Sequence, residues 1–225
     1  MSKLYIVATP IGNLEDMTLR AISVLKSVDF ILCEDTRVTR RLLEKFDIDK
    51  PAVSFHQHSG PRKYELAERY IRDGMNLAYV SDAGTPGIND PGGQLIDYLL
   101  GKFSDLKVIP VPGASALTTA LSVCGFPLEK FLFLGFMPHK KGRNKMCQEI
   151  ADYKHEVVFF ESTYRILKTL EQLKEYIGER PVVVGRELTK MFETVYRGTT
   201  EEILNKLKKD VTKGEFVIVV GPKIK

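Results

Sequence analysis

Cysteine is scarce in this sequence, with three residues among 225. Cys33, Cys124 and Cys147 are odd in number, lie far apart, and show none of the paired spacings that bind a metal. We therefore expect free thiols in a reducing cytoplasm. His56 and His58 stand two residues apart, but no third ligand follows at a recognisable spacing, so we expect no metal site.

The sequence also lacks a long apolar run. No stretch approaches the roughly 20 residues that are needed to span a bilayer. The apolar core of the first ten residues, MSKLYIVATP, breaks at Thr9 and Pro10, and no small-residue cleavage site follows. We expect neither a membrane association nor a secretory signal, and a cytoplasmic location.

Two common nucleotide-binding motifs are absent. The sequence has no G-x-x-x-x-G-K-[ST], so phosphate binding by a P-loop is not expected. No G-x-G-x-x-G joins a first strand to a helix, so an ordinary dinucleotide site is not expected either. The composition, 44% hydrophobic and 28% charged, is that of an ordinary soluble globular protein.

Positive charge is in modest excess but unevenly spread. The net charge of +4 permits a polyanionic partner without requiring one. Basic residues gather at Arg37, Arg40 and Arg41, then at Lys140, Lys141, Arg143 and Lys145, and again at Lys206, Lys208 and Lys209. Each cluster is either a solvated face, which is the usual meaning of a charge run, or part of a binding surface.

Short apolar runs alternate with helical patterns in the first half of the chain. The patterns predict strands at 4–8, 30–33, 52–55, 77–81 and 108–111, and helices at 18–28, 36–46, 62–73, 92–100 and 115–123. Alternation of this kind requires crossover connections. It therefore predicts an α/β domain with a mostly parallel five-stranded sheet.

The second half has a different rhythm. The patterns predict strands at 131–135, 157–160, 182–185, 194–196 and 216–220, and helices at 141–152, 164–176 and 200–208. No helix fits between 182–185 and 194–196, so these two strands should form a hairpin-like antiparallel pair. We therefore predict two α/β domains, residues 1–114 with a parallel sheet and residues 115–225 with a mixed sheet.

Small, polar or charged residues follow every predicted strand of the first domain. The longest such loop, within VSDAGTPGINDPGG (80–93), has four glycines, two prolines and two aspartates. Ligands of open α/β sheets bind beyond the carboxyl ends of the strands, so these loops predict a ligand site. A carboxylate at Asp82 suits a ribose or an ammonium group. The alternative is that Asp82 only caps the next helix.

Six motifs together resemble one known family. They are Thr9-Pro-Ile-Gly-Asn-Leu14, Cys33-Glu-Asp-Thr-Arg37, the glycine-rich loop, Pro112-Gly-Ala-Ser-Ala116, Phe159-Phe-Glu-Ser162 and Gly185-Arg-Glu-Leu-Thr-Lys190. In this order they resemble the ribosomal RNA small subunit methyltransferase I family of the tetrapyrrole-methylase-like superfamily. The resemblance extends from Leu4 to about Val220.

The resemblance implies an S-adenosylmethionine-dependent enzyme that methylates the ribose 2′-hydroxyl of a cytidine in small-subunit (16S) ribosomal RNA. It also implies the tetrapyrrole methylase fold, a cofactor cleft between the two domains, and a homodimer that acts on the RNA or on the 30S subunit. Matched by motif, the cofactor contacts are Pro10, Asp82, Ala83, Gly84, Thr85, Ser115, Ala116 and Phe160.

Methylation of a hydroxyl requires help with deprotonation, because a ribose hydroxyl has a high pKa. A base or a cation beside the oxygen would provide it, and we expect Glu187 or Lys190 to have this catalytic role. Arg186 and Arg37 would hold phosphate by bidentate contacts. Alternatively, Arg186 pairs with Glu187 at a domain interface, and Arg37 pairs with neighbouring acidic residues.

Recognition of one ribose also requires contacts to splayed bases. Phe55, His56 and His58 are candidate stacking surfaces for the substrate. Two other functions remain open at this point. One is carbon methylation of a tetrapyrrole (precorrin or uroporphyrinogen), and the other is a non-catalytic module that binds a nucleoside and RNA. A methyltransferase of diphthamide synthesis fits the motifs less well.

Overall fold

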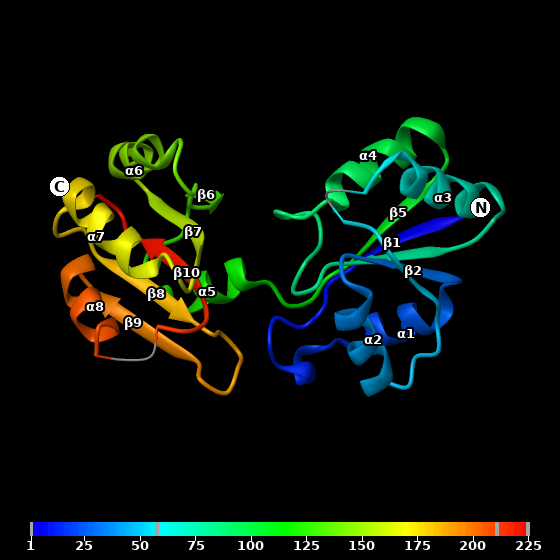
Figure 1. Cartoon of the computed structure of the whole chain (residues 1–225), viewed down its shortest axis with the longest axis horizontal. Helices are drawn as coiled ribbons and strands as arrows, with labels where there is room; N and C mark the ends of the chain where they lie inside the picture. The colour runs from blue at the N-terminus through cyan, green and yellow to red at the C-terminus, as the bar shows by residue number, and fades with distance from the viewer. Residues whose placement is uncertain (1, 57–58, 210–211, 224–225) are drawn as a thin grey trace. The chain divides into compact units, whose positions relative to one another are not determined.

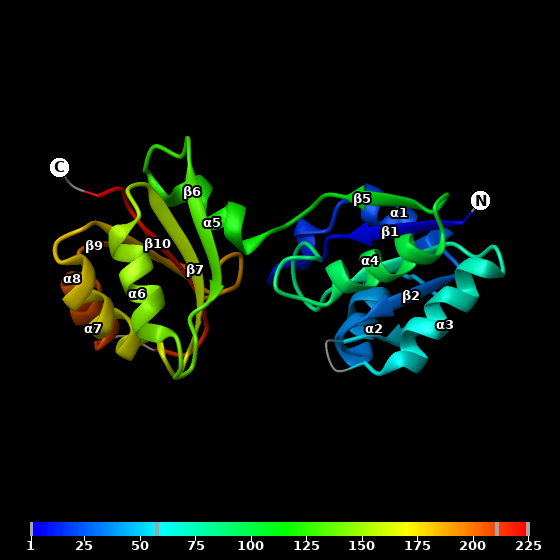
Figure 2. The same ribbon diagram turned by 90° about the horizontal axis from the view of Figure 1, so that it is seen from above.

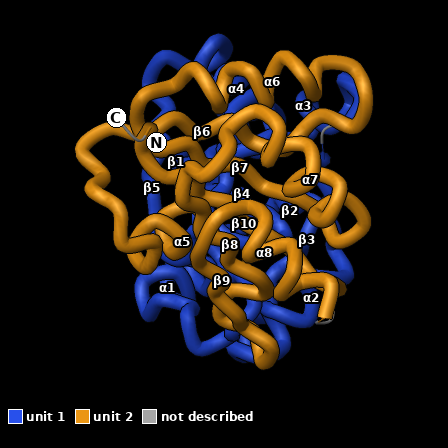
Figure 3. The backbone as a smooth tube through the Cα atoms, turned by 90° about the vertical axis from the view of Figure 1, so that its left-hand side faces the viewer, with its two compact units in different colours: residues 1–115 blue, residues 116–225 orange. Residues whose placement is uncertain are grey.

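The structure, a computed structural model, describes residues 2–56, 59–209 and 212–223. The chain divides into two compact units, residues 1–115 and 116–225 (Figure 3). Each unit has its own five-stranded sheet; the first has two buried hydrophobic clusters and the second has one large cluster.

The first unit is built on a parallel sheet with the strand order β3-β2-β4-β1-β5. Its strands are β1 (Lys3–Val7), β2 (Phe30–Cys33), β3 (Ala52–Ser54), β4 (Leu77–Val80) and β5 (Lys107–Val111). All neighbouring strands pair in parallel. Every residue of β4 is buried, which is why this strand reads as a continuous apolar run rather than an alternating pattern.

Helices cover both faces of this sheet (Figure 1). They are α1 (Leu19–Ser27), α2 (Thr36–Lys45), α3 (Pro61–Arg72) and α4 (Gly92–Lys102), with a short 3-10 turn η1 (Leu14–Asp16) before α1. α1 and α2 share one buried cluster with the sheet, and α3 and α4 share a second. The side chain of Thr18 caps α1, and that of Asp35 caps α2. Side chains that alternate along the strands therefore belong to two separate cores, one with α1 and α2 and the other with α3 and α4.

The second unit has a mixed sheet with the strand order β6-β7-β10-β8-β9. Its strands are β6 (Phe131–Phe136), β7 (Glu156–Ser162), β8 (Val182–Arg186), β9 (Thr194–Gly198) and β10 (Glu215–Val220). β6 and β7 are parallel, whereas β10 is antiparallel to both β7 and β8, and β8 is antiparallel to β9. The last strand in sequence thus lies in the middle of the sheet.

The helices of the second unit are distributed unequally over its sheet (Figure 2). They are α5 (Ala116–Cys124), α6 (Arg143–Asp152), α7 (Ile166–Ile177) and α8 (Thr200–Leu207). α6, α7 and α8 cover one face and share a large buried cluster with it, while α5 packs against β8 and β10 on the other face. A capping box of Thr199 and Glu202 begins α8.

The pairing pattern decides which loops of the second unit come together. β7 and β8 both run antiparallel to β10, and β6 runs parallel to β7, so β6, β7 and β8 point the same way. Their carboxyl ends share one edge of the sheet. The loops at 137–142, 163–165 and 187–193 therefore lie along that edge.

The predicted fold class is confirmed, with a parallel five-stranded sheet, a mixed five-stranded sheet and an antiparallel β8–β9 pair. Element ends differ from the prediction by one or two residues. For example, α7 begins at Ile166 instead of Tyr164, because residues 163–165 form a turn after β7. In the part of the chain that the structure describes, no helix is long and apolar enough to cross a membrane.

Candidate functional site

The loops after β1 and β4 are joined backbone to backbone at the carboxyl edge of the first sheet. The Thr9 amide donates to the Gly84 carbonyl at 2.9 Å, and the Gly84 amide donates to the Thr9 carbonyl at 3.1 Å. The Thr9 hydroxyl also donates to the Ser81 carbonyl at 3.2 Å. Gly84 has φ +85°, and a Cβ there would lie 3.1 Å from Cγ2 of Ile11. Glycine is required here, because any side chain would be both strained and crowded.

Asp90 fixes the second part of the glycine-rich loop. One of its carboxylate oxygens accepts hydrogen bonds from the Gly87 and Ile88 amides at 2.7 and 3.1 Å. The other accepts from the Gly92 amide at 2.8 Å and lies 3.4 Å from the Tyr79 hydroxyl. The loop is therefore held at several points along its length, which suits the wall of a binding site.

Two carboxylates connect the loop after β2 with the loop after β4. Oε1 of Glu34 accepts a hydrogen bond from the Asp82 amide at 3.2 Å. In return, Oδ1 of Asp82 accepts from the Asp35 amide at 3.0 Å. Each side chain thus fixes the backbone of the other loop, and the three acidic residues are held together at the sheet edge.

The electrostatic environment of these carboxylates is unfavourable to their own charge. Partial burial is the main cause that raises the pKa of Glu34, and the charges of Asp82 and Asp90 raise it further. Partial burial likewise raises the pKa of Asp82, and the Asp35 charge adds to it. Within the described residues neither Glu34 nor Asp82 forms an ion pair. A cationic group placed here would therefore be stabilised.

The structure brings most of the predicted cofactor residues to this edge. Pro10 and Gly84 are buried, whereas Asp82 and Ala83 each have part of their surface exposed to solvent. The Thr85 hydroxyl donates to the Ala114 carbonyl at 3.0 Å, which connects the glycine-rich loop to the segment after β5.

The remaining predicted cofactor residues lie at or beyond the end of this unit. Ser115 is the last residue of the first unit, and Ala116 begins α5 in the second. Phe160 lies on β7 in the second unit. There its ring makes edge-on contacts with the rings of Phe133 and Phe136, at centroid distances of 5.1 and 5.3 Å.

Arg37, predicted to hold phosphate, forms an ion pair with Asp35. Its Nη2 lies 2.7 Å from Oδ2 of Asp35, and its Nε donates to the same carboxylate at 3.1 and 3.2 Å. Hydrogen bonds from Arg37 lower the pKa of Asp35 to about 2. The Arg37 side chain is nevertheless 87% exposed, so the guanidinium is open to solvent beside its partner.

The three predicted stacking residues have different outcomes. Phe55 is 1% exposed and makes edge-on contacts with Tyr64 and Tyr79, so the prediction that it stacks on a base is wrong. The apolar neighbours of α3 and β4 bury it in the core. His56 is exposed, and its amide donates to the Ser59 hydroxyl at 2.9 Å. His58 lies outside the described residues.

The two candidate catalytic residues meet at the carboxyl edge of the second sheet. Nζ of Lys190 lies 2.9 Å from Oε1 of Glu187 and 2.9 Å from Oε2 of Glu215. Oε1 of Glu187 also accepts from the Glu215 amide at 2.9 Å. Glu187 and Thr189 have φ of +50° and +67°, a left-handed conformation that is uncommon outside glycine. Side-chain contacts therefore hold the loop in a strained shape.

The charges in this cluster determine the protonation of Lys190. Partial burial lowers the pKa of Lys190, but the hydrogen bonds and charges of Glu187 and Glu215 outweigh it and leave the pKa raised. Partial burial of Glu187 acts to raise its pKa, and the contacts from Lys190 and the Glu215 amide outweigh that effect and lower it. Lys190 is therefore an ammonium at neutral pH. Of the two predicted roles, Lys190 therefore fits that of a cation beside the oxygen better than that of a base that accepts the proton.

Arg186 is oriented into its own unit. It is buried, and its Nε donates to the Lys213 carbonyl at 2.8 Å. This position does not favour the predicted phosphate contact.

One charged cluster was missed by the sequence analysis. Glu161 is 1% exposed; its Oε1 lies 2.8 Å from Nη2 of Arg165, and its Oε2 lies 3.8 Å from Nη1 of Arg143. The Thr169 hydroxyl donates to Oε2 of Glu161 at 2.6 Å and accepts from Nη2 of Arg143 at 2.9 Å. The signal was the spacing of Arg143 three residues before Met146, which places it on the buried face of α6.

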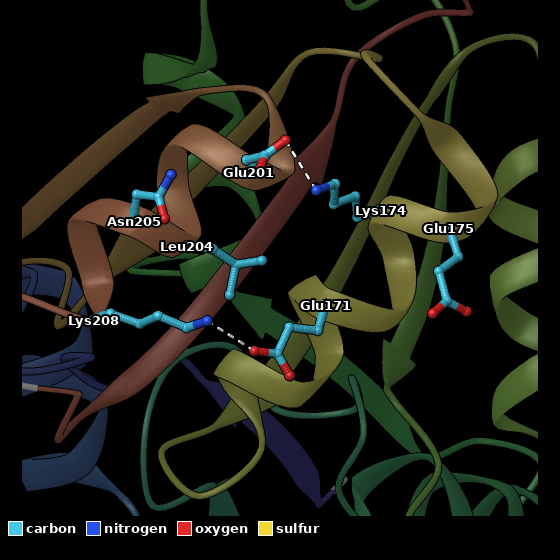
Figure 4. A pocket seen from close by; sticks show the side chains of 7 residues that line it. All are labelled: Glu171, Lys174, Glu175, Glu201, Leu204, Asn205 and Lys208. Carbon is cyan, nitrogen blue, oxygen red and sulfur yellow. Dashed lines mark ion pairs between the residues drawn. The ribbon is translucent and has the colours of Figure 1, made fainter.

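The other surface features carry less chemistry. A groove between α7 and α8 is lined by Glu171, Lys174, Glu175, Glu201, Leu204, Asn205 and Lys208 (Figure 4). Two ion pairs cross it, Lys174 to Glu201 at 2.9 Å and Lys208 to Glu171 at 3.0 Å, and their charges neutralise each other. Among the described residues, no group of three or more potential metal ligands occurs.

The fold is that of a known class of enzyme. The family model for tetrapyrrole (corrin/porphyrin) methylases matches residues 3–204. Among solved structures, diphthine synthase aligns with a TM-score of 0.77 and 14% identity, covering 99% of this chain and 90% of that one. Cobalt precorrin-4 methyltransferase aligns with a TM-score of 0.70 and 17% identity, covering 97% and 94%. At these identities the likeness shows the fold alone.

Sequence relatives place the chain more narrowly. It is 42% identical to "Ribosomal RNA small subunit methyltransferase I" of Thermotoga maritima, over 99% of this chain and 100% of the relative. The proteins of the same name from Halalkalibacterium halodurans and Bacillus subtilis are 45% and 41% identical, and each alignment covers 75% of the relative and at least 96% of this chain. The chain therefore belongs to the tetrapyrrole methylase family and, within it, to the ribosomal RNA small subunit methyltransferase I group.

It follows that the chain is a methyltransferase with S-adenosylmethionine as the methyl donor. The residues of the first-unit edge fit this group. S-adenosylmethionine carries a sulfonium and an ammonium, and Glu34 and Asp82 are partly desolvated carboxylates without an ion-pair partner among the described residues. The loop beside them is held by the hydrogen bonds of Gly84 and Asp90, and Ala83 within it is exposed, where a nucleoside can approach.

Proposed function

We propose that the chain methylates the ribose 2′-hydroxyl of a cytidine in small-subunit (16S) ribosomal RNA. The observation that carries the proposal is the 41–45% identity to relatives named for ribosomal RNA methylation, over nearly the full length of this chain. The Lys190 cluster supports it, since a hydroxyl acceptor needs a group that stabilises the developing oxyanion.

In this proposal the first unit supplies most of the cofactor site. Asp82 and Glu34 hold a positive group of S-adenosylmethionine, while Ala83 and Thr85 present backbone to the nucleoside. Gly84, whose amide and carbonyl bond to Thr9, adds a contact surface without a side chain. Pro10, Ser115, Ala116 and Phe160 complete the set as further cofactor contacts. When bound, S-adenosylmethionine would supply an electrophilic methyl group, whose C–S bond would break toward a thioether leaving group if the ribose oxygen is held in line with it.

Lys190 is the proposed catalytic residue, and Glu187 positions it. The ammonium of Lys190 stabilises the ribose oxygen as it loses its proton, because a nearby positive charge lowers the pKa of a hydroxyl. Glu187 and Glu215 both lie 2.9 Å from Nζ and fix its position. Glu187 is the other candidate for accepting the proton, but the contacts that lower its pKa make it a weak base.

RNA contacts in this proposal involve Arg37 and His56, both exposed on the first unit. Arg37 would exchange its bidentate contact with Asp35 for a bidentate contact with phosphate. Arg186 is retained only as a support for the loop after β8, given its burial. We further propose that the enzyme acts in the cytoplasm and that it is a homodimer. Sedimentation at several protein concentrations would test the oligomeric state.

The test is methyl transfer from S-adenosylmethionine labelled in its methyl group. Protein is incubated with 30S particles, with free 16S ribosomal RNA, or with uroporphyrinogen, and the RNA is digested to nucleosides and analysed by mass spectrometry. The proposal expects label in 2′-O-methylcytidine from one of the two RNA substrates. Label on a base, or only in the tetrapyrrole, would contradict it and favour another reaction of the family.

A further inference from the structure

The carboxyl edge of the second sheet carries two segments that are rich in cations and free of carboxylates. Residues 137–147 contain Lys140, Lys141, Arg143 and Lys145, and residues 162–170 contain Arg165 and Lys168. Neither segment contains an aspartate or a glutamate. The local positive charge therefore exceeds the net charge of +4 of the whole chain.

The arginines and lysines of these segments have different roles. Arg143 and Arg165 face inward and share the buried carboxylate of Glu161. In contrast, Lys140, Lys141, Lys145 and Lys168 are exposed, and none has an ion-pair partner within the described residues. The lysines are therefore the cations left available to a ligand.

The inward-facing arginines hold the two segments against each other. Nη1 of Arg165 donates to the Met137 carbonyl at 2.8 Å, and Nη1 of Arg143 donates to the Pro138 carbonyl at 3.2 Å. Both are fixed by Glu161, at the end of β7. The lysine-bearing loop thus begins from a backbone that is already positioned, so less conformational entropy is lost when a ligand binds.

An exposed aromatic side chain stands within the same surface. Tyr164 lies in the turn after β7, directly before Arg165, and is 96% exposed. Lys168 follows four residues later on α7. Lysines that contact phosphates, together with an aromatic ring on which a base can stack, are the two elements by which proteins bind single-stranded nucleic acid.

We infer that Lys140, Lys141, Lys145, Lys168 and Tyr164 form a binding surface for a single-stranded segment of RNA. We name it the lysine surface. The lysines contact phosphates, and Tyr164 stacks on an unpaired base. This inference rests on the proposed function for the identity of the RNA, and it assigns the contact to the second unit.

The test compares two charge reversals of equal size. Lys140→Glu/Lys141→Glu changes the lysine surface. Lys154→Glu/Lys223→Glu changes two exposed lysines before β7 and after β10, at the opposite edge of the same sheet, where the Lys223 amide donates to the Lys154 carbonyl at 3.0 Å. All four side chains are exposed, so both variants should fold, which circular dichroism checks.

Binding is measured by fluorescence anisotropy with a single-stranded RNA of roughly 20 nucleotides, longer than the ~4–16 nucleotides of a typical site, and with 16S ribosomal RNA. We expect Lys140→Glu/Lys141→Glu to weaken binding at least tenfold. The slope of log affinity against log salt should fall by about 1.4, since each single-strand phosphate contact contributes about 0.7. The opposite-edge variant should bind like the wild type. Equal losses in both variants, or no loss in either, would overturn the inference.

Tyr164 gives an independent test of stacking. Tyr164→Ala should weaken binding at least about fivefold, whereas Tyr164→Phe should not, because stacking needs the ring and not the hydroxyl. Unchanged binding by Tyr164→Ala would overturn the stacking role. Weaker binding to 30S particles with unchanged binding to free RNA would indicate an acidic protein as the partner instead, which also contradicts the inference.

The outcome is separable from that of the proposed function. RNA binding is measured without turnover, and S-adenosylmethionine affinity, measured by calorimetry, should be the same in all variants. If the wild type leaves 16S ribosomal RNA unmethylated while the binding pattern holds, only the proposed function fails. If the wild type methylates the RNA and the variants bind normally, only the lysine surface fails.

Discussion

The two units place opposite charges at equivalent positions of their sheets. At the carboxyl edge of the first sheet, Glu34 and Asp82 hold each other's loops and are partly desolvated. At the carboxyl edge of the second sheet, Lys190 is paired with two glutamates, and the unpaired cations are those of the lysine surface. The same topological position thus suits a cationic cofactor in one unit and a polyanion in the other. Net charge alone would have hidden this separation.

The largest expected effect concerns the buried cluster that supports the second edge. Glu161→Ala leaves the buried Arg143 and the partly buried Arg165 without their carboxylate. We expect it to lower the free energy of unfolding by about 3–5 kcal/mol. Glu171→Ala, which breaks the exposed pair with Lys208, is the control and should cost only ~0–1 kcal/mol. Urea unfolding measures both, and similar losses would show that burial of Glu161 has no special role.

The next effect concerns the proposed role of Lys190 as the cation beside the acceptor oxygen. Lys190→Ala should lower the single-turnover rate of methyl transfer by about 10²- to 10³-fold, since a group that stabilises an oxyanion typically contributes that much. Lys190→Arg, which keeps the charge, should recover part of the rate.

Cofactor affinity is the control for this prediction, and it should be unchanged in both Lys190 variants. Glu187→Gln should lower the rate less, because Glu215 still holds Lys190. Near-wild-type rates in both Lys190→Ala and Glu187→Gln would remove the catalytic assignment.

At the first edge, Asp82 is expected to set the affinity for S-adenosylmethionine. Asp82→Ala should weaken binding about 10- to 100-fold, the range of a hydrogen bond to a charged group. Asp35→Ala is a neighbouring control, because Asp35 meets Asp82 through its backbone amide, which the change retains. Calorimetry measures both, and equal affinities for the wild type and Asp82→Ala would locate the cofactor elsewhere.

The raised pKa values of Glu34 and Asp82 predict opposite pH effects on binding and on folding. Cofactor affinity should fall as the pH is lowered, beginning above the ordinary carboxyl pKa of about 4, because protonation removes the negative charge. The folded protein binds these protons more readily than the unfolded chain. The contribution of Glu34 and Asp82 to the free energy of unfolding therefore rises as the pH falls through the same range.

Glu34→Gln isolates this effect from the other titrating groups, which include Asp35, Asp90 and Arg37 around the same site. Its cofactor affinity should depend less steeply on pH than that of the wild type. As the pH falls, the wild type should gain unfolding free energy relative to Glu34→Gln, while its cofactor affinity falls. Parallel changes in binding and stability would contradict the predicted signs.

The smallest effect concerns the exposed Arg37. Arg37→Ala should change the thermal midpoint little, since the Arg37 side chain is 87% exposed and solvent screens its ion pair. If Arg37 contacts phosphate, the salt slope of RNA binding should still fall by about 0.7. An unchanged slope would show that Arg37 does not contact phosphate and only forms the ion pair with Asp35.

Hydrophobic periodicity was enough to predict the elements and both sheet types, because each strand and helix has a local pattern. The strand order could not be predicted from the sequence, because the central position of β10 arises from pairing between segments far apart in the chain. Phe55 was misread because a residue after a short strand can be exposed or buried, and contacts with Tyr64 and Tyr79 decide it.

The candidate sites were predictable in type but not in contacts. The acidic and glycine-rich loops after the parallel strands pointed to a ligand edge, yet the exchange between Glu34 and Asp82 depends on side-chain geometry. Arg143 looked like part of a basic run, and only its position on the buried face of α6 separated it from the neighbouring lysines.

The central claim is that the carboxyl edges of the two sheets carry opposite charges. Its most direct test is to measure two affinities in two variants by calorimetry, with S-adenosylmethionine and with single-stranded RNA as ligands. The account predicts that Asp82→Ala weakens cofactor binding and leaves RNA binding unchanged. It also predicts that Lys140→Glu/Lys141→Glu weakens RNA binding and leaves cofactor binding unchanged. If either variant loses both ligands while remaining folded, the separation of the two sites by charge is wrong.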